Sequence, residues 1–265
     1  MSFTRVSKSH PCPVCKKPDW CRVFADGWVE CMRVQSERSA KSGGWMHGHR
    51  QGLLPPLPRP QQRSFVPPPP TINATKIYRA WDAHTTQMQL QDLGGRLGLS
   101  IMPLGAVGAA WSPPHAAWAF PMYDGYGEIV GIRLRANDGR KWAVRGSRQG
   151  IFLANAAPQK TLFVCEGPTD TAAAVELGLF AVGRPNCCCG GPEIKIYARQ
   201  HAVSRVVIIS DNDKPGLDGA RKVGGELKLP FAVYVPPAKD VREFVRLGGT
   251  RAMIENTLNN TVWNT

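Results

Sequence analysis

The stretch TLFVCEGPTDTAAAVELG, residues 161–178, decides the fold. An apolar run of strand length ends at Glu166, a Gly-Pro turn follows, and an alanine-rich segment suited to a helix begins at once. The pattern recurs at RVVIISD (205–211) and FAVYVPP (231–237), with helical segments between the apolar runs. Strands that alternate with helices indicate βαβ units around a parallel sheet, and hence an α/β fold class.

The pattern upstream of this stretch is different. Residues 73–99 predict helical turns broken at Gly94-Gly95, because glycine weakens a helix interior. Residues 116–146 alternate apolar and polar side chains around Asp-Gly and Asn-Asp-Gly turns, which indicates hairpins. Further upstream, residues 51–70 contain eight prolines, so this segment favours an extended polyproline linker.

These changes of pattern predict an order of parts along the chain. We expect a small zinc-ribbon-like module, a Pro-rich linker, a basic α+β subdomain, a Rossmann-like parallel-sheet domain and a C-terminal tail. The expected bounds are 1–50, 51–71, 72–158, 159–249 and 250–265.

The composition favours a polyanionic partner. The chain has 265 residues and a formal net charge of +13, with 11 lysines and arginines against four acids in residues 1–63. Its apolar runs are shorter than the roughly 18 residues that cross a bilayer, so we expect no membrane association. The N-terminal sequence MSFTRVSKSHPC has no apolar signal segment, which predicts a cytoplasmic protein.

Four cysteines near the start of the chain predict a metal site. Cys12, Cys15, Cys21 and Cys31 have the spacing C-x2-C-x5-C-x9-C, and the first pair forms a tight knuckle suited to Zn²⁺. A module of about fifty residues has too small a core to fold unaided, so a structural metal has a physical reason to be there. Because the second pair lacks the usual knuckle spacing, a histidine could replace one of the thiols. The candidates are His10, His47 and His49.

Aromatic and cationic side chains alternate around this knuckle. Trp20, Arg22, Trp28 and Arg33 suit stacking on bases and pairing with phosphates, although the tryptophans could equally form the core of the module. The three consecutive cysteines at 187–189 have no evident role, and adjacent side chains in an extended segment point to opposite faces, which disfavours a second metal site there.

Carboxylates follow two of the predicted strands. Glu166 ends one strand, and Asp211 and Asp213 follow another, so all three are expected at the carboxyl edge of the sheet, where ligands bind in open α/β folds. Like charges gathered there repel one another unless cations lie between them. An oxygen-rich site of this kind suits Mg²⁺ or Mn²⁺ with room for phosphate oxygens.

Three segments resemble the motifs of a known superfamily. VCEGPTD (164–170), ISDNDKPGLDGA (209–220) and VPPAKDVREFVRLGG (235–249) look like the three motifs of the TOPRIM domain, most closely that of replicative DNA primases from bacteria, phages and plasmids. GEIVGIRLRANDGRKWAVRGSRQGIF (127–152) is similar to the basic half of the primase polymerase core, and the zinc module completes the order of parts.

The resemblance implies roles for particular residues. Glu166, Asp211 and Asp213 would be catalytic and would bind Mg²⁺ or Mn²⁺, with Asp170 and Asp240 as supporting acids. Basic side chains would hold template or nucleotide phosphates: Arg133, Arg135, Lys141, Arg145, Arg148 and Lys239.

The implied activity is the synthesis of RNA primers on single-stranded DNA from nucleoside triphosphates by two-metal nucleotidyl transfer. The zinc module would recognise the template. Because the sequence lacks G-x-x-x-x-G-K-[ST], a separate helicase or replication initiator would unwind the duplex.

Two other functions fit parts of the pattern. Recombination mediators join a four-cysteine zinc motif to a TOPRIM-like domain and clamp DNA without polymerising, although a clamp would not need the full acidic set. A metal-dependent nuclease could use the same acidic edge. A type I topoisomerase is disfavoured, since the chain is too short for its strand-passage domains.

Overall fold

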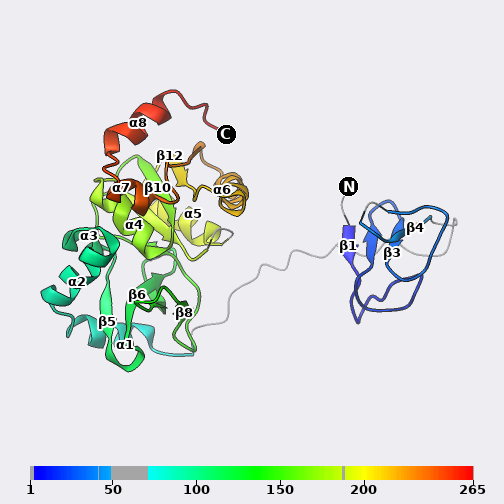
Figure 1. Cartoon of the computed structure of the whole chain (residues 1–265), viewed down its shortest axis with the longest axis horizontal. Coiled ribbons are helices and arrows are strands. Elements are labelled where there is room, and N and C mark those ends of the chain that lie inside the picture. The colour runs from blue at the N-terminus through cyan, green and yellow to red at the C-terminus, as the bar shows by residue number, and fades with distance from the viewer. Residues whose placement is uncertain (1–2, 41, 49–70, 187–188, 265) are drawn as a thin grey trace. The chain divides into compact units, whose positions relative to one another are not determined.

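The computed structural model describes residues 3–40, 42–48, 71–186 and 189–264. The chain forms two compact units, Met1–Val66 and Pro67–Thr265 (Figure 1). The predicted linker lies outside the described residues except for Thr71, and the five predicted segment bounds stay a prediction. No helix in the described ranges is long and apolar enough to cross a membrane.

The N-terminal unit is a small antiparallel sheet. Its strands follow chain order: β1 (Phe3–Arg5), β2 (Arg22–Phe24), β3 (Val29–Cys31) and β4 (Trp45–His47). Its buried apolar side chains are Val29 and three of the four N-terminal cysteines. Such a core is too small to stabilise a domain by burial alone, as the sequence suggested.

The second unit begins with three helices, α1 (Ala74–Asp82), α2 (Gln87–Leu97) and α3 (Ile101–Ala106). The predicted break at Gly94-Gly95 is wrong, because α2 continues through both glycines and ends at Gly98, whose φ is +70°. Gly94 has a packing role instead: a Cβ there would collide with the carbonyl oxygen of Leu99.

An antiparallel meander follows, and it confirms the predicted hairpins. Its strands are β5 (Ala110–Ser112), β6 (Ala117–Tyr123), β7 (Ile129–Arg135) and β8 (Lys141–Ala143), with the 3-10 turn η1 (Pro113–His115) after β5. Asp124 stabilises the β6–β7 turn by accepting hydrogen bonds from the backbone N–H groups of Tyr126 and Glu128. Helix α1 covers one face of this sheet through Tyr78, and the other face contributes Trp118, Phe120 and Met122 to the core shared with α4.

A five-stranded sheet of order β13-β12-β10-β11-β9 forms the rest of the unit. Strands β10 (Thr161–Glu166), β11 (Ala181–Arg184), β12 (Arg205–Ile209) and β13 (Phe231–Tyr234) are parallel, and β9 (Phe152–Leu153) is an antiparallel edge strand. The isolated bridge between Tyr123 and Ile151 connects the meander to this sheet. The predicted α/β class is confirmed.

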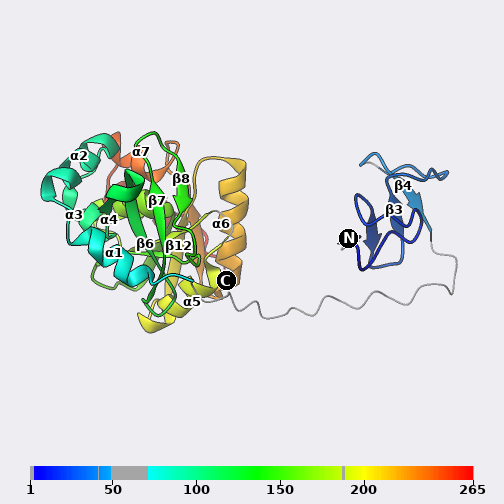
Figure 2. The same cartoon turned by 90° about the horizontal axis from the view of Figure 1, so that it is seen from below.

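Helices cover both faces of the parallel sheet. They are α4 (Gly167–Glu176), α5 (Gly191–Gln200), α6 (Lys214–Leu227), α7 (Val241–Arg246) and α8 (Arg251–Asn259). Helices α4, α7 and α8 share one core with alternate strand residues, and α5 and α6 share a second core on the opposite face (Figure 2). The C-terminal segment packs on this sheet, with Ile254 fully buried and Asn264 bridging Phe231 of β13.

Candidate active site and metal-binding cluster

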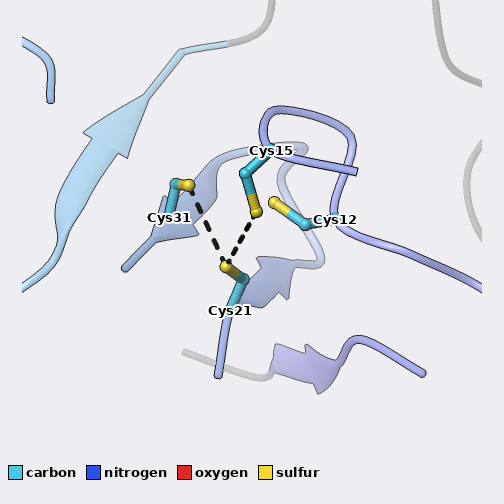
Figure 3. A group of neighbouring side chains, drawn as sticks. All are labelled: Cys12, Cys15, Cys21 and Cys31. Atoms are coloured by element: carbon cyan, nitrogen blue, oxygen red, sulfur yellow. Dashed lines mark hydrogen bonds between the residues drawn. The ribbon is translucent and has the colours of Figure 1, made fainter. Parts of the chain in front are cut away.

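The four N-terminal cysteines come together in the first unit. Their sulfur atoms all lie within 4.8 Å of one another, with Sγ–Sγ distances of 3.7 Å for Cys15–Cys21 and 3.9 Å for Cys21–Cys31 (Figure 3). A tetrahedral Zn²⁺ with four Zn–S bonds of about 2.3 Å requires thiolates gathered in this way. The cluster fits a structural zinc site.

Neither His10 nor His47 completes this cluster. The ring Nε2 of His47 lies 3.0 Å from the carbonyl oxygen of Val34, and His10 is outside the group of mutually close ligand atoms. His49 lies outside the described residues, as do Cys187 and Cys188. Within the ranges that the structure describes, the ligand set is therefore the four cysteines, and Cys189 is a separate free thiol.

Hydrogen bonds and burial act in opposite directions on the thiolates of the cluster, which are the form that binds metal. The backbone N–H groups of Met32 and Val34 donate to the sulfurs of Cys21 and Cys31, each at 3.4 Å. Burial raises the pKa of Cys15, but hydrogen bonds from the Lys17 backbone and the neighbouring thiols outweigh it and bring that pKa to about 6. Burial raises the pKa of Cys12 and brings that of Cys21 to about 12, so these two thiols need a bound cation to ionise.

The two predicted recognition tryptophans differ in exposure. Trp20 is 76% exposed beside the knuckle, so it is not a core residue. Trp28 is half-buried, with the guanidinium of Arg38 5.1 Å from its ring centre. Arg33 forms an ion pair with Asp19 at 2.7 Å, which holds its charge close to the cysteines. Of the two indoles, only Trp20 presents its surface to a partner.

The predicted acids lie at the carboxyl edge of the parallel sheet. Glu166 ends β10, and Asp211 and Asp213 follow the adjacent parallel strand β12. Burial, and after it the negative charges of Glu166, Asp240 and Asp213, raise the pKa of Asp211 to about 6 against the opposing charge of Lys141. The other carboxylates are therefore close enough to Asp211 to disfavour its ionisation.

Asp170 belongs to the same acidic edge. It is in the first turn of α4, and burial is the largest cause of its raised pKa of about 7. Arg242 lowers that pKa, and Asp240 and Asp211 raise it. One of its oxygens, Oδ1, is buried with no hydrogen-bond partner among the described residues. A buried acceptor without a donor, next to other carboxylates, has the chemistry of a site for a hard cation.

Two of the acids also have structural roles. Asp213 caps α6 by accepting from the Gly216 N–H at 2.7 Å, and Asp240 caps α7 by accepting from the Glu243 N–H at 2.7 Å. The acid side chains lie further from one another than the cysteine side chains do. In the described part of the chain, the four cysteines are the one group whose metal-binding atoms all lie within 4.8 Å of one another. Binding of a cation would thus require the acid side chains to move closer together.

The predicted basic residues divide into two sets. Arg133, Arg135 and Lys141 lie on the face of the meander opposite α1, since Arg135 pairs directly with Lys141 and Ile132 and Leu134 point toward the helix. Burial lowers the pKa of Arg133 and of Arg135. Lys141 is exposed and electrostatically coupled to Asp170 and Asp211, so this set reaches the acidic edge.

The other basic residues lie apart from the acids or beside a groove. Arg145 is exposed after β8, and Arg148 pairs with Asp124 of the β6–β7 turn at 3.5 Å. Lys239 lines a groove of about 350 Å³, which we call the basic groove. Its cations are Arg96, Arg135, Lys239, Arg242 and Arg246, and its acids are Asp240 and Glu243.

Three of the cationic residues that line this groove were not identified in the sequence analysis. Arg242 and Arg246 are four residues apart on α7 and follow Lys239, a spacing that places them on one side of the helix. That spacing was a usable signal. Arg96, on α2, had none, because only the tertiary fold brings it to α7. Arg184, fully buried and in register with Glu166, could have been found by the same strand-end argument as the acids.

Comparisons with known proteins agree with the fold. No protein-family model and no curated protein sequence matches the chain. Among solved structures, the Escherichia coli primase catalytic core matches with a TM-score of 0.55 and 16% identity over 71% of this chain and 79% of that chain. The zinc-binding and RNA polymerase domains of Aquifex aeolicus primase match with a TM-score of 0.56 and 13% identity, over 71% of this chain and 62% of that one. A DnaG primase catalytic domain bound to single-stranded DNA matches with a TM-score of 0.54 and 16% identity, over 71% and 80%. The chain has the fold of primase catalytic cores.

Proposed function

We propose that this chain is a DNA primase of the TOPRIM type, which synthesises short RNA primers on single-stranded DNA. The observation that carries the proposal is the acidic edge itself: Asp211 and Asp170 have raised pKa values because they are buried among other carboxylates. That edge lies at the strand ends where α/β folds bind ligands, in a fold shared with primase catalytic cores.

The acids would hold Mg²⁺ or Mn²⁺. When bound, such ions activate the attacking 3′-hydroxyl and neutralise the leaving pyrophosphate, as in two-metal nucleotidyl transfer. Asp211, Asp213 and Glu166 would supply ligand oxygens, and Asp170 and Asp240 would support them. Asp213 and Asp240 are held in place by their helix caps, which fixes the backbone around the site before substrate binds.

The basic groove would hold the phosphates of the incoming nucleotide. It presents five cations against two acids and includes Asp240, one of the proposed supporting acids. Arg242 is anchored by hydrogen bonds to Asp240 and to Thr169 of α4, so its guanidinium is positioned without substrate. A positioned guanidinium suits the paired oxygens of a phosphate.

The remaining parts complete the proposed enzyme. Arg133 and Lys141 would contact the template or the nucleotide. Arg145 and Arg148 would contact phosphates further along the DNA template. The zinc module would select the template through the exposed Trp20, and the Pro-rich linker at 51–71 would carry it to the active site. A separate helicase or replication initiator would supply the single strand. A DnaG primase catalytic domain of this fold has been solved with single-stranded DNA bound.

A primer-synthesis assay tests the proposal. The full chain is incubated with ribonucleotides, Mg²⁺ and single-stranded DNA of random sequence, and the products are sequenced. Asp211→Asn should abolish dinucleotide formation and leave DNA binding intact. Asp218→Asn is the matched control, because Asp218 is an exposed acid on α6 that pairs with Lys214 of the same helix. Cleavage of the template without synthesis would show a nuclease, and binding without either reaction would show a clamp.

A further inference from the structure

A second groove adjoins the basic groove. Its volume is about 370 Å³, and it lies between α2 and the edge of the meander at Trp111 and Trp118. We call it the tryptophan groove, and its lining includes Met88, Asp92, Arg96, Trp111, Trp118 and Asn137. Arg96 lines both grooves, and its ion pair with Asp92 at 3.0 Å lies at their junction.

Strand pairing aligns this groove with the catalytic residues. Trp111 on β5 lies opposite Trp118 on β6, Trp118 lies opposite Arg135 on β7, and Arg135 lies opposite Lys141 on β8. Directly opposite residues in antiparallel strands share one face of the sheet. The four side chains therefore form one row, which changes from aromatic to cationic in the direction of Asp170 and Asp211.

The aromatic end of the row has features of a binding surface. The Trp111 and Trp118 rings are 5.4 Å apart in an edge-to-face arrangement. Trp118 is a core residue, so the ring surface on offer is that of Trp111, which is only half-buried. Met88, across the groove on α2, is 76% exposed. The indole Nε1 of Trp118 is buried without a hydrogen-bond acceptor in the described residues, an uncommon state for an indole N–H.

We propose that the tryptophan groove holds the base of a nucleoside triphosphate whose phosphates lie in the basic groove. The inference deepens the proposed primase function, on which it rests for the identity of the substrate. A planar base with polar edges suits a groove that offers an indole surface, a thioether and the amide of Asn137. The junction at Arg96 allows one ligand to place its base and its phosphates in the two grooves at once.

The proposal predicts that base and phosphate binding can be separated. The binding of ATP and of inorganic tripolyphosphate to the full chain is measured by calorimetry with Mg²⁺ present. Trp111→Leu should weaken ATP binding by about tenfold through lost stacking, while tripolyphosphate binding changes less than about twofold. Trp111→Phe should recover most of the ATP affinity because it restores an aromatic ring. Arg135→Gln should weaken both ligands.

Trp142→Leu is the matched control. Trp142 is also half-buried on the meander, but it pairs with Leu134 on the opposite face, against α1. Its replacement should leave the ratio of ATP to tripolyphosphate affinity unchanged. Equal loss of both ligands in Trp111→Leu would overturn the proposal, because the tryptophan would then support the sheet rather than a base.

Two further measurements, of single-stranded DNA binding and of primer synthesis, complete the test. They show whether the bound base belongs to the nucleotide or to the template, and they separate this inference from primase activity. If Trp111→Leu weakens the binding of single-stranded DNA but not of ATP, the groove belongs to the template and the proposal is wrong. If the wild-type chain makes primers and Trp111→Leu leaves ATP affinity unchanged, the base site alone fails. Trp111-dependent ATP binding without any primer synthesis would support the base site and refute the primase function.

Discussion

Arg242 donates a hydrogen bond to Oδ2 of Asp240 at 3.2 Å, and its other terminal nitrogen lies 3.3 Å from the hydroxyl of Thr169. The guanidinium thus connects α7 to the start of α4, beside the buried carboxyl of Asp170. It is also the cation that most lowers the pKa of Asp170. One side chain therefore joins the basic groove to the acidic edge.

Arg242→Ala should damage both binding and stability. Loss of the cation removes the charge that opposes protonation of Asp170, so the pKa of Asp170 should rise further above its value of about 7. Loss of the donor leaves the buried Oδ2 of Asp240 unsatisfied, which should lower the free energy of unfolding by about 1–3 kcal/mol. Chemical denaturation measures the second effect, and calorimetry with tripolyphosphate measures the loss of phosphate affinity.

Arg246→Ala provides the comparison for that variant. Arg246 lines the same groove but is exposed, and its ion pair with Glu243 at 3.3 Å is on the surface. Its replacement should weaken tripolyphosphate binding and change the free energy of unfolding by less than about 1 kcal/mol. Equal stability losses in the two variants would contradict the bridging role of Arg242.

The raised pKa values predict how stability depends on pH. The pKa of Asp211 is about 6 and that of Asp170 about 7 in the folded chain, against an ordinary aspartate value of 3.8. Groups with a raised folded pKa contribute stability that is complete below pH of about 4 and is lost as pH rises through about 7. Without divalent metal, the second unit should therefore lose this contribution between those values, as measured by thermal unfolding across pH.

Metal should reverse this loss only where the acids are ionised. Mn²⁺ or Mg²⁺ should raise the melting temperature at pH 8 and have little effect at pH 5, since protonated carboxyls bind metal poorly. Asp211→Asn should reduce both the pH dependence and the metal effect. A metal-induced stabilisation that is the same at pH 5 and pH 8 would argue that the ions bind elsewhere.

The sequence predicts the parallel sheet well because its strands are short apolar runs ended by glycine, proline or acid. The positions of Glu166, Asp211 and Asp213 at strand ends follow from the same signal, which needs no knowledge of distant contacts. The hairpins are equally local, because Asp124 and its turn neighbours bond to one another.

What the sequence misses depends on contacts between segments far apart in the chain. Helix α2 passes through Gly94 because packing against the Leu99 backbone outweighs a low helix propensity. Arg96 becomes a groove residue because α2 lies beside α7 in the folded chain. The row from Trp111 to Lys141 depends on strand register. The hydrophobic pattern alone does not tell which residues of neighbouring strands lie opposite each other.

The cysteine cluster predicts a metal-dependent first unit. Purified chain should contain one zinc ion, measured by atomic absorption, and Cys21→Ser should lose it, because Cys21 is buried between two other thiols. A strong chelator should remove the circular-dichroism signal of the small sheet and leave a separate melting transition for the second unit. Priming at preferred template sites should fall more than general binding to single-stranded DNA.

Cys189→Ser is the control for that substitution, because Cys189 is a free thiol outside the cluster. It should retain the zinc and the template preference. Retention of one zinc per chain in Cys21→Ser would contradict the four-cysteine ligand set.

Two glycines of α6 give a matched test of the acidic edge. A Cβ on Gly216 would lie 2.8 Å from the backbone oxygen of Asp211 and 3.0 Å from Oδ1 of Asp213, closer than side chains normally pack. Gly216→Ala should therefore displace both acids, reduce primer synthesis at least about tenfold, and weaken the stabilisation by Mn²⁺. Gly225, in the same helix, has no atom within 4 Å of the added Cβ. Gly225→Ala should keep full activity and raise the free energy of unfolding by up to about 1 kcal/mol, because alanine is the better helix former. If instead Gly216→Ala keeps both primer synthesis and the metal response, the position of Asp211 and Asp213 relative to the start of α6 does not matter for catalysis, and the metal site must be built from the other acids.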